Sequence, residues 1–143
     1  MPTPEVYVFR VLLNRKLYRE IEIAGSKTLC DLAEAIVAAY GFDFDHAFGF
    51  FSNLTRNIYA SPVKYELFAD MGEPGSRSVK RTKIAGAFPS VGAQMTFLFD
   101  YGDDWQFRTV LVGKNKKQAG IRYPRIVKTV GDAPEQYPEV DEE

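Results

Sequence analysis

Phe97-Leu98-Phe99-Asp100-Tyr101-Gly102-Asp103-Asp104-Trp105-Gln106-Phe107 places three acids and the only tryptophan of the chain between two apolar runs. Aromatic residues at alternate positions on each side predict two β-strands. Asp and Gly in the middle favour a tight turn, because Asp bonds nearby backbone N–H groups and Gly tolerates positive φ. The stretch therefore predicts a hairpin with its turn at 100–104. The side chains expected to help build its core are Phe97, Phe99, Trp105 and Phe107.

A helix is predicted upstream, over residues 28–40. Thr28 followed three residues later by Asp31 forms a capping box, and Gly41 suits the end of a helix. Between them, apolar residues recur at spacings of three and four, which defines one helical face. These residues are Leu29, Leu32, Ala33, Ile36, Val37 and Tyr40.

The rest of the chain is dominated by alternating apolar residues, which indicate strands. Strands are expected at 6–13, 17–23, 48–51, within 57–68, 95–99, 105–112 and 126–130. A hairpin, a helix and then further strands is a β-grasp-like order. It predicts an α+β fold, with a largely antiparallel β-sheet and one main helix packed on a face. Residues 1–130 are expected to form a single domain, and 131–143 an acidic, Pro-containing C-terminal tail that is extended or disordered.

Size and composition narrow the class of protein. The 143 residues, 45% of them hydrophobic and 26% charged, are enough for one domain with its own core. Cys30 is the only cysteine, so no intrachain disulfide forms, which suits a reducing cytoplasm. No apolar run approaches the roughly 18 residues of a membrane span, and the first residues lack signal-peptide features. We therefore expect a cytoplasmic protein without membrane association.

The acidic turn is the first candidate functional site. Its simplest interpretation is structural, with Trp105 anchoring the turn against the core. Alternatively, its carboxylates act as oxygen ligands or acid–base groups, or the turn contacts a partner. The spacing does not match a calcium-binding loop. The candidate residues are Asp100, Asp103, Asp104, Trp105 and His46.

Metal and catalytic sites have few residues to build on. His46 is the only histidine, and a lone histidine beside aromatic residues is most simply structural. One His and one Cys are too few for a zinc site, so we expect no tightly bound metal, no cofactor and no assigned catalytic residue. No sequence feature supports a nucleophilic pair of Cys30 and His46.

Charge is unevenly distributed, although the net value is only −1. Residues 131–143 hold six acids and no Lys or Arg, whereas no acid lies between Asp104 and Asp132. Two parts of the chain are rich in Lys and Arg. One is the stretch 108–128, and the other is a second basic cluster that comprises Arg77, Lys80, Arg81 and Lys83. The stretch 108–128 is either a solvated face or a nucleic-acid contact, in which cations track phosphates and aromatic rings stack on bases. The candidate contact residues are Arg108, Lys114, Lys116, Lys117, Arg122, Tyr123, Arg125 and Lys128.

Three motifs give the chain a family resemblance. They are Phe97-x-Phe-Asp-Tyr-Gly-Asp-Asp-Trp105, Gly41-Phe-Asp43 with Asp45-His46-x-Phe, and Tyr123-Pro124 followed by Gly131-Asp-Ala-Pro134-Glu135. From about Val6 to Tyr137 the chain resembles the plasmid pRiA4b ORF-3-like family, which includes passenger proteins of bacterial insertion elements. The resemblance implies a compact α+β fold and no particular activity.

The chain also departs from that family at two positions. Members often carry His-x-His after the helix and Trp-Glu-His after the acidic turn. Here Phe48 stands at the second of these histidines and Phe107 at the third. The double replacement suggests that the two positions repack as an apolar contact.

The leading functional hypothesis is a non-enzymatic binding module for a protein partner, in plasmid or mobile-element biology. The first alternative is nucleic-acid binding through the basic 108–128 face. The second is a metal-dependent hydrolase that uses the turn 100–104. The sequence determines neither the partner nor the oligomeric state.

Overall fold

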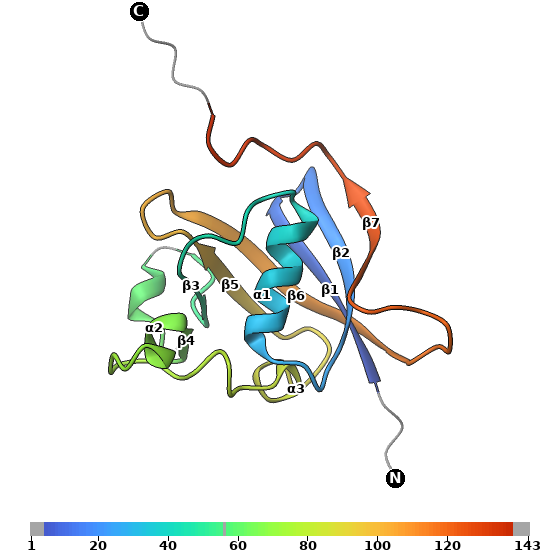
Figure 1. The fold of residues 1–143 in the computed structure, drawn as a ribbon, viewed down its shortest axis with the longest axis horizontal. Coiled ribbons are helices and arrows are strands. Elements are labelled where there is room, and N and C mark those ends of the chain that lie inside the picture. The colour runs from blue at the N-terminus through green and yellow to red at the C-terminus, as the bar shows by residue number, and fades with distance from the viewer. Residues whose placement is uncertain (1–4, 56, 139–143) are drawn as a thin grey trace, which may run out of the picture.

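A seven-stranded antiparallel sheet forms the body of the protein (Figure 1). The structure is a computed structural model and describes residues 5–55 and 57–138. The strand order is β4-β3-β5-β6-β1-β2-β7. The elements are β1 Glu5–Asn14, β2 Leu17–Ala24, α1 Leu29–Ala39, β3 Phe48–Phe51, the 3-10 helix η1 Ile58–Ala60, β4 Lys64–Glu66, α2 Leu67–Asp70, α3 Ile84–Ala87, β5 Gln94–Phe99, β6 Trp105–Lys116 and β7 Arg125–Val130.

The predicted helix is confirmed as α1, which lies across one face of the sheet (Figure 1). Thr28 accepts a hydrogen bond from the Asp31 N–H, and Asp31 accepts one from the Thr28 N–H, so the capping box is complete. Gly41 follows with a φ of 71°, the left-handed conformation that ends many helices. Five of the six residues expected on the apolar face are buried within the helix, and Tyr40 is buried just after it.

The expected largely antiparallel sheet with one main helix is present, and α1 is the only helix longer than four residues in the described part of the chain. A β-grasp-like arrangement is not confirmed, because every pair of neighbouring named strands is antiparallel. One expected strand is shorter than its apolar pattern suggested. Leu67 and Phe68 continue from β4 into the single turn of α2.

The main core lies between α1 and the sheet and is rich in phenylalanine. Phe97 and Phe107 are paired across β5 and β6, and both are fully buried on the α1 side. Phe9 meets Phe88 edge-on at 4.9 Å between ring centroids. Burying each such ring contributes about 1.5–3 kcal/mol, so the aromatic rows hold helix and sheet together. Among the described residues, no helix is long and apolar enough to cross a membrane.

The two edge strands of the sheet differ in how far their outward backbone groups are hydrogen-bonded. At the β4 edge, the backbone of Arg77 donates to Lys64 and accepts from Glu66, which closes much of this short strand. At the opposite edge, β7 pairs with β2 on one side and has no strand on the other within the described ranges. Among the described strands, β7 therefore has the one backbone edge that is open along its length.

Candidate functional site

The acidic turn is held by the carboxylate of Asp100. Its Oδ1 accepts hydrogen bonds from the N–H groups of Gly102 and Asp103, at 3.1 and 3.2 Å. Asp100 and Asp104 both have left-handed backbones, with φ values of 65° and 56°. Asp tolerates this conformation because its short side chain can bond nearby N–H groups, as Asp100 does here. The Asp100 side chain is only 9% exposed, so the turn is built around a nearly buried carboxylate.

Strand register brings His46 to this carboxylate. Phe48 on β3 pairs with Phe99 on β5. The N–H of the following residue, Asp100, donates a hydrogen bond to the carbonyl of Ala47, which precedes Phe48. His46 then lies beside the turn, with its Nε2 3.3 Å from Asp100 Oδ2 and 3.8 Å from Asp45 Oδ1. The candidates His46 and Asp100, 54 positions apart, thus become neighbours.

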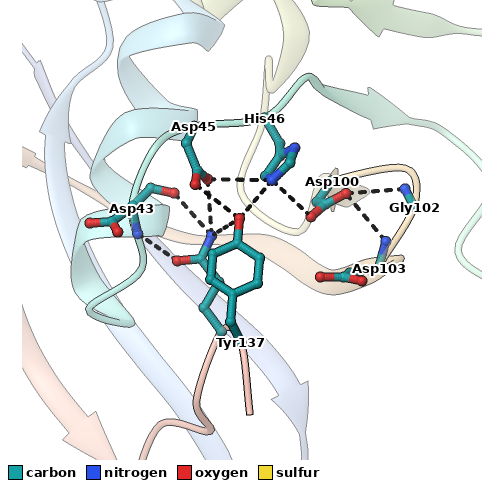
Figure 2. Close-up of polar contacts among 8 residues, drawn as sticks. Asp43, Asp45, His46, Asp100, Gly102, Asp103 and Tyr137 are labelled. Carbon is teal, nitrogen blue, oxygen red and sulfur yellow. Dashed lines mark hydrogen bonds and ion pairs between the residues drawn. The ribbon is translucent and has the colours of Figure 1, made fainter. Parts of the chain in front are cut away.

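The C-terminal segment completes the cluster (Figure 2). The side-chain amide of Gln136 accepts from the Asp43 N–H at 2.7 Å and donates to the Asp43 carbonyl at 3.1 Å. Tyr137 donates its hydroxyl to Asp45 Oδ2 at 2.9 Å, and its oxygen lies 2.6 Å from His46 Nε2. Residues 131–137 therefore return across the upper end of the sheet to the loop after α1 (Figure 1). The boundary between domain and tail at residue 131 stays a prediction, and residues 139–143 lie outside the described ranges.

These contacts form a chain from carboxylate to phenol to imidazole. Desolvation, followed by the hydrogen bond to Asp45 and the nearby negative charges, raises the pKa of Tyr137 to about 12. The phenol is protonated at neutral pH and donates to Asp45, so its oxygen can accept from His46 in the tautomer that carries a proton on Nε2. Among the described residues, no serine, threonine or cysteine side chain is hydrogen-bonded to these three groups. In the described part of the chain, no three His, Cys, Asp or Glu side chains are placed to hold a metal ion.

The other side chains of the turn form no hydrogen bond to this cluster in the described part of the chain. Asp103 is exposed, and Asp104 accepts a hydrogen bond from the amide of Gln106 at 2.9 Å. The Trp105 ring packs 4.9 Å from Phe42, just beyond α1, and its buried indole Nε1 has no partner among the described residues. The turn therefore joins a polar cluster on one side to the aromatic core on the other.

Cys30 does not pair with His46. It lies in the first turn of α1, whereas His46 follows the far end of this helix, whose 11 residues span about 16 Å. Burial raises the pKa of the Cys30 thiol, although Lys80 opposes this shift. The thiol is thus not activated as a nucleophile.

The two phenylalanines that replace family histidines are both core residues. Phe48 lies 6.0 Å and Phe107 5.8 Å from the ring of Phe97, so they flank one shared ring. Among the described residues the two rings form no direct pair, so the expected contact between them is replaced by a shared contact with Phe97.

The basic candidates are spread over two separated strands, β6 and β7, and the loop that joins them. β6 and β7 have β1 and β2 between them in the sheet, so the stretch 108–128 does not lie on one strip. Arg125 pairs with Glu22 at 2.6 Å, and Lys128 lies over the ring of Tyr18 at 5.7 Å. Several candidates also make contacts within the protein. Arg108 donates to the Leu54 carbonyl and Lys114 to the Pro89 carbonyl, and Tyr123 accepts from the Gln118 N–H. The candidates without such side-chain contacts among the described residues, Lys116, Lys117 and Arg122, are exposed.

A groove between α1 and β7 was not anticipated from the sequence. It consists of two adjoining hollows of about 280 and 260 Å³, which share Ala35, Ala38 and Pro124 in their walls. Beside it on β7, Ile126 is 50% and Val127 43% exposed. The small alanines on the outer flank of α1 are the only sequence signal that pointed to a hollow here.

Comparisons with known proteins agree on family and fold. A family model described as plasmid pRiA4b ORF-3-like protein matches residues 5–138. Among solved structures, the chain is similar to the crystal structure of a protein of unknown function, MM3350, from Methanosarcina mazei Go1. The two share 20% sequence identity and a TM-score of 0.72, and the match covers 93% of this chain and 73% of that chain. No curated protein matches the chain.

Proposed function

Because the chain belongs to the plasmid pRiA4b ORF-3-like family, we propose that it is a cytoplasmic, non-enzymatic binding module of plasmid or mobile-element biology. The family description supports the association with plasmids. The proposed ligand is a protein partner, whose extended segment adds to β7 and fills the groove between α1 and β7. One observation carries this proposal: β7 has an open backbone edge beside an apolar hollow, whereas the β4 edge is largely closed by Arg77.

The chemistry of the edge favours an extended peptide over other ligands. An added strand would bond the outward backbone groups of β7 and place every second side chain toward the groove. There, Ala35, Ala38 and Ile126 would contact apolar side chains of the partner. Arg122 and Lys128 are exposed near the two ends of β7, and they favour acidic residues beside the apolar ones in the partner.

The same strand carries two features that limit indiscriminate pairing. Val127 is an extra residue in the ladder, because Glu20 pairs with Lys128 while Ile21 pairs with Ile126. Bulges and edge lysines are devices by which natural sheets resist aggregation. The edge is therefore suited to a partner of matching shape rather than to any exposed strand.

Matched variants test the proposal. Ile126→Asp and Ala38→Arg place a charge on the edge and a long side chain in the groove, whereas Val91→Asp changes a comparably exposed valine elsewhere. We expect a partner captured from the native host to be retained by wild type and Val91→Asp and lost from the two groove variants. In the complex, the amides of residues 125–130 should gain protection from hydrogen exchange.

Two results would contradict the proposal. The first is a partner that binds all four proteins equally, or that leaves the exchange of β7 amides unchanged. The second is capture that disappears on nuclease treatment, which would instead favour the nucleic-acid hypothesis.

A further inference from the structure

A further hollow, of about 470 Å³ and separate from the groove, lies near the start of β1 and the end of β2. Its lining includes Tyr7 on β1, Ala24 at the end of β2, Gly25 just after this strand, and Ala85 on α3. Gly25 is required there, because a Cβ at this position would lie 2.5 Å from a ring carbon of Tyr7. The glycine thus lets the Tyr7 ring lie directly against the backbone. The volume is within the range of small-molecule sites, about 300–1,000 Å³.

Tyr7 supplies an unused polar group to this lining. Its side chain belongs to the core and is only 6% exposed. Its hydroxyl has no hydrogen-bond partner among the described residues and is not one of the fully buried polar atoms, so this oxygen is open to water or to a ligand in the hollow. A ligand oxygen in the hollow would satisfy this donor.

Lysines from the two separate basic clusters of the sequence meet at the same hollow. Lys83 immediately precedes α3 and Lys117 immediately follows β6, and both line the hollow. Within the described ranges, neither forms an ion pair. A third cation, Lys114, lies 4.8 Å from the centroid of the Tyr7 ring and donates to the carbonyl of Pro89. Glu5 is the one acid in the lining, so cations predominate.

From this arrangement we propose that the hollow binds a small organic anion. The apolar body of the ligand would rest on Tyr7, Ala24 and Ala85, and its oxyanion group would lie between Lys83, Lys117 and the Tyr7 hydroxyl. Charge-assisted hydrogen bonds to an oxyanion are among the stronger polar contacts in proteins. The site is distinct from the groove proposed for a protein partner, since the two share no lining residue.

The test uses 8-anilinonaphthalene-1-sulfonate, which joins an aromatic body to an oxyanion and fluoresces when bound in an apolar site. Its neutral control is N-phenyl-1-naphthylamine, which keeps the aromatic body and lacks the sulfonate. We expect the wild type to bind the sulfonate saturably with one-to-one stoichiometry. The double variant Lys83→Met/Lys117→Met should weaken this binding at least about tenfold, and Tyr7→Phe should weaken it about threefold to tenfold.

Control measurements distinguish specific binding at this hollow from non-specific binding of the dye to the protein surface. Lys16→Met removes an exposed lysine from the turn between β1 and β2 and should bind the sulfonate as wild type does. Binding of the neutral amine should not fall in the double lysine variant. Absence of saturable sulfonate binding, equal binding by the double lysine variant, or equal affinity for the neutral amine would each overturn the proposal.

Discussion

Arg19 is the residue whose replacement should disturb the fold most specifically. It is a cation with only 4% exposure, and no carboxylate pairs with it in the described part of the chain. Its guanidinium instead donates to the carbonyls of Tyr18, Ala39, Val130 and Gly131, at 3.0–3.2 Å. It also lies 4.8 Å from the centroid of the Tyr40 ring. Arg19 therefore ties the end of β7 to the end of α1.

The cost of Arg19→Met follows from these contacts. Hydrogen bonds to charged groups contribute about 1.5–3 kcal/mol each to the free energy of unfolding. The sum over the four bonds of Arg19 is an upper limit, because the variant also avoids the cost of burying a charge. Burying an unpaired guanidinium costs several kcal/mol, and methionine removes this cost while retaining much of the apolar packing. We expect a net loss of about 3 kcal/mol, which for a domain of this size lowers Tm by about 10 °C.

Urea denaturation and hydrogen exchange check both the magnitude and the location. The amides of β7 should lose protection in Arg19→Met, whereas those of β5, two strands beyond β1, should keep it. Arg10→Met is the matched control, because the Arg10 side chain is 40% exposed, pairs with Glu20 and lies over the ring of Tyr18 at the surface. Its replacement should cost less than about 1 kcal/mol. If Arg19→Met falls within about 0.5 kcal/mol of wild type, or if exchange rises uniformly across the sheet, the clamp does not exist.

Three further outcomes are expected. Ile36→Ala removes a fully buried side chain and should cost roughly 2–5 kcal/mol in urea denaturation; a loss below about 0.5 kcal/mol would show that Ile36 is not core. Trp105, packed on Phe42, should emit at a blue-shifted wavelength that moves to the red on unfolding, and native emission at the free-indole wavelength would refute this packing. Burial raises the pKa of Tyr40 from 10.0 to about 12, even though Arg19 opposes the shift. Between pH 10.0 and about 12, Tyr40 therefore ionises in the unfolded state but stays neutral in the folded state. The stability due to neutral Tyr40 is present below pH 10.0 and is lost toward pH 12; Tyr40→Phe should therefore flatten the alkaline decline, and an unchanged decline would argue against this assignment.

Local patterns were sufficient to predict α1 and the hairpin of β5 and β6. A capping box and a helical stripe act within a few residues, and strand alternation does the same for Phe97 and Phe99. Arg19 had a local signal as well, because it shares its face of β2 with the buried Ile21 and Ile23. A cation at an apolar position of a strand pattern indicates either a residue at the sheet edge or a buried residue that bonds to neighbouring segments. The positions of α1 and β7 decide between these two alternatives, and neither position can be read from the sequence of β2.

The polar cluster was harder to predict because its parts are far apart in the chain. His46 and Asp100 meet through the register of β3 and β5, which no single segment encodes. Gln136 and Tyr137 lie in a segment whose acids and prolines are typical of disorder, yet they bond to residues 91–93 positions away. Such contacts depend on the length of β7 and on where Arg19 holds its end.

The arrangement of these sites makes the proposals separable by experiment. The Tyr7 hollow includes Gly25 and Ser26, just before α1, whereas the His46 cluster follows the other end of this helix. The groove runs along the flank of the same helix through Ala35 and Ala38. Changes at Lys83 or Lys117 therefore leave the β7 edge intact, and Ile126→Asp leaves the Tyr7 hollow intact. Arg19→Met, in contrast, should weaken partner binding at β7 without changing sulfonate binding at Tyr7, because it releases the strand and not the hollow.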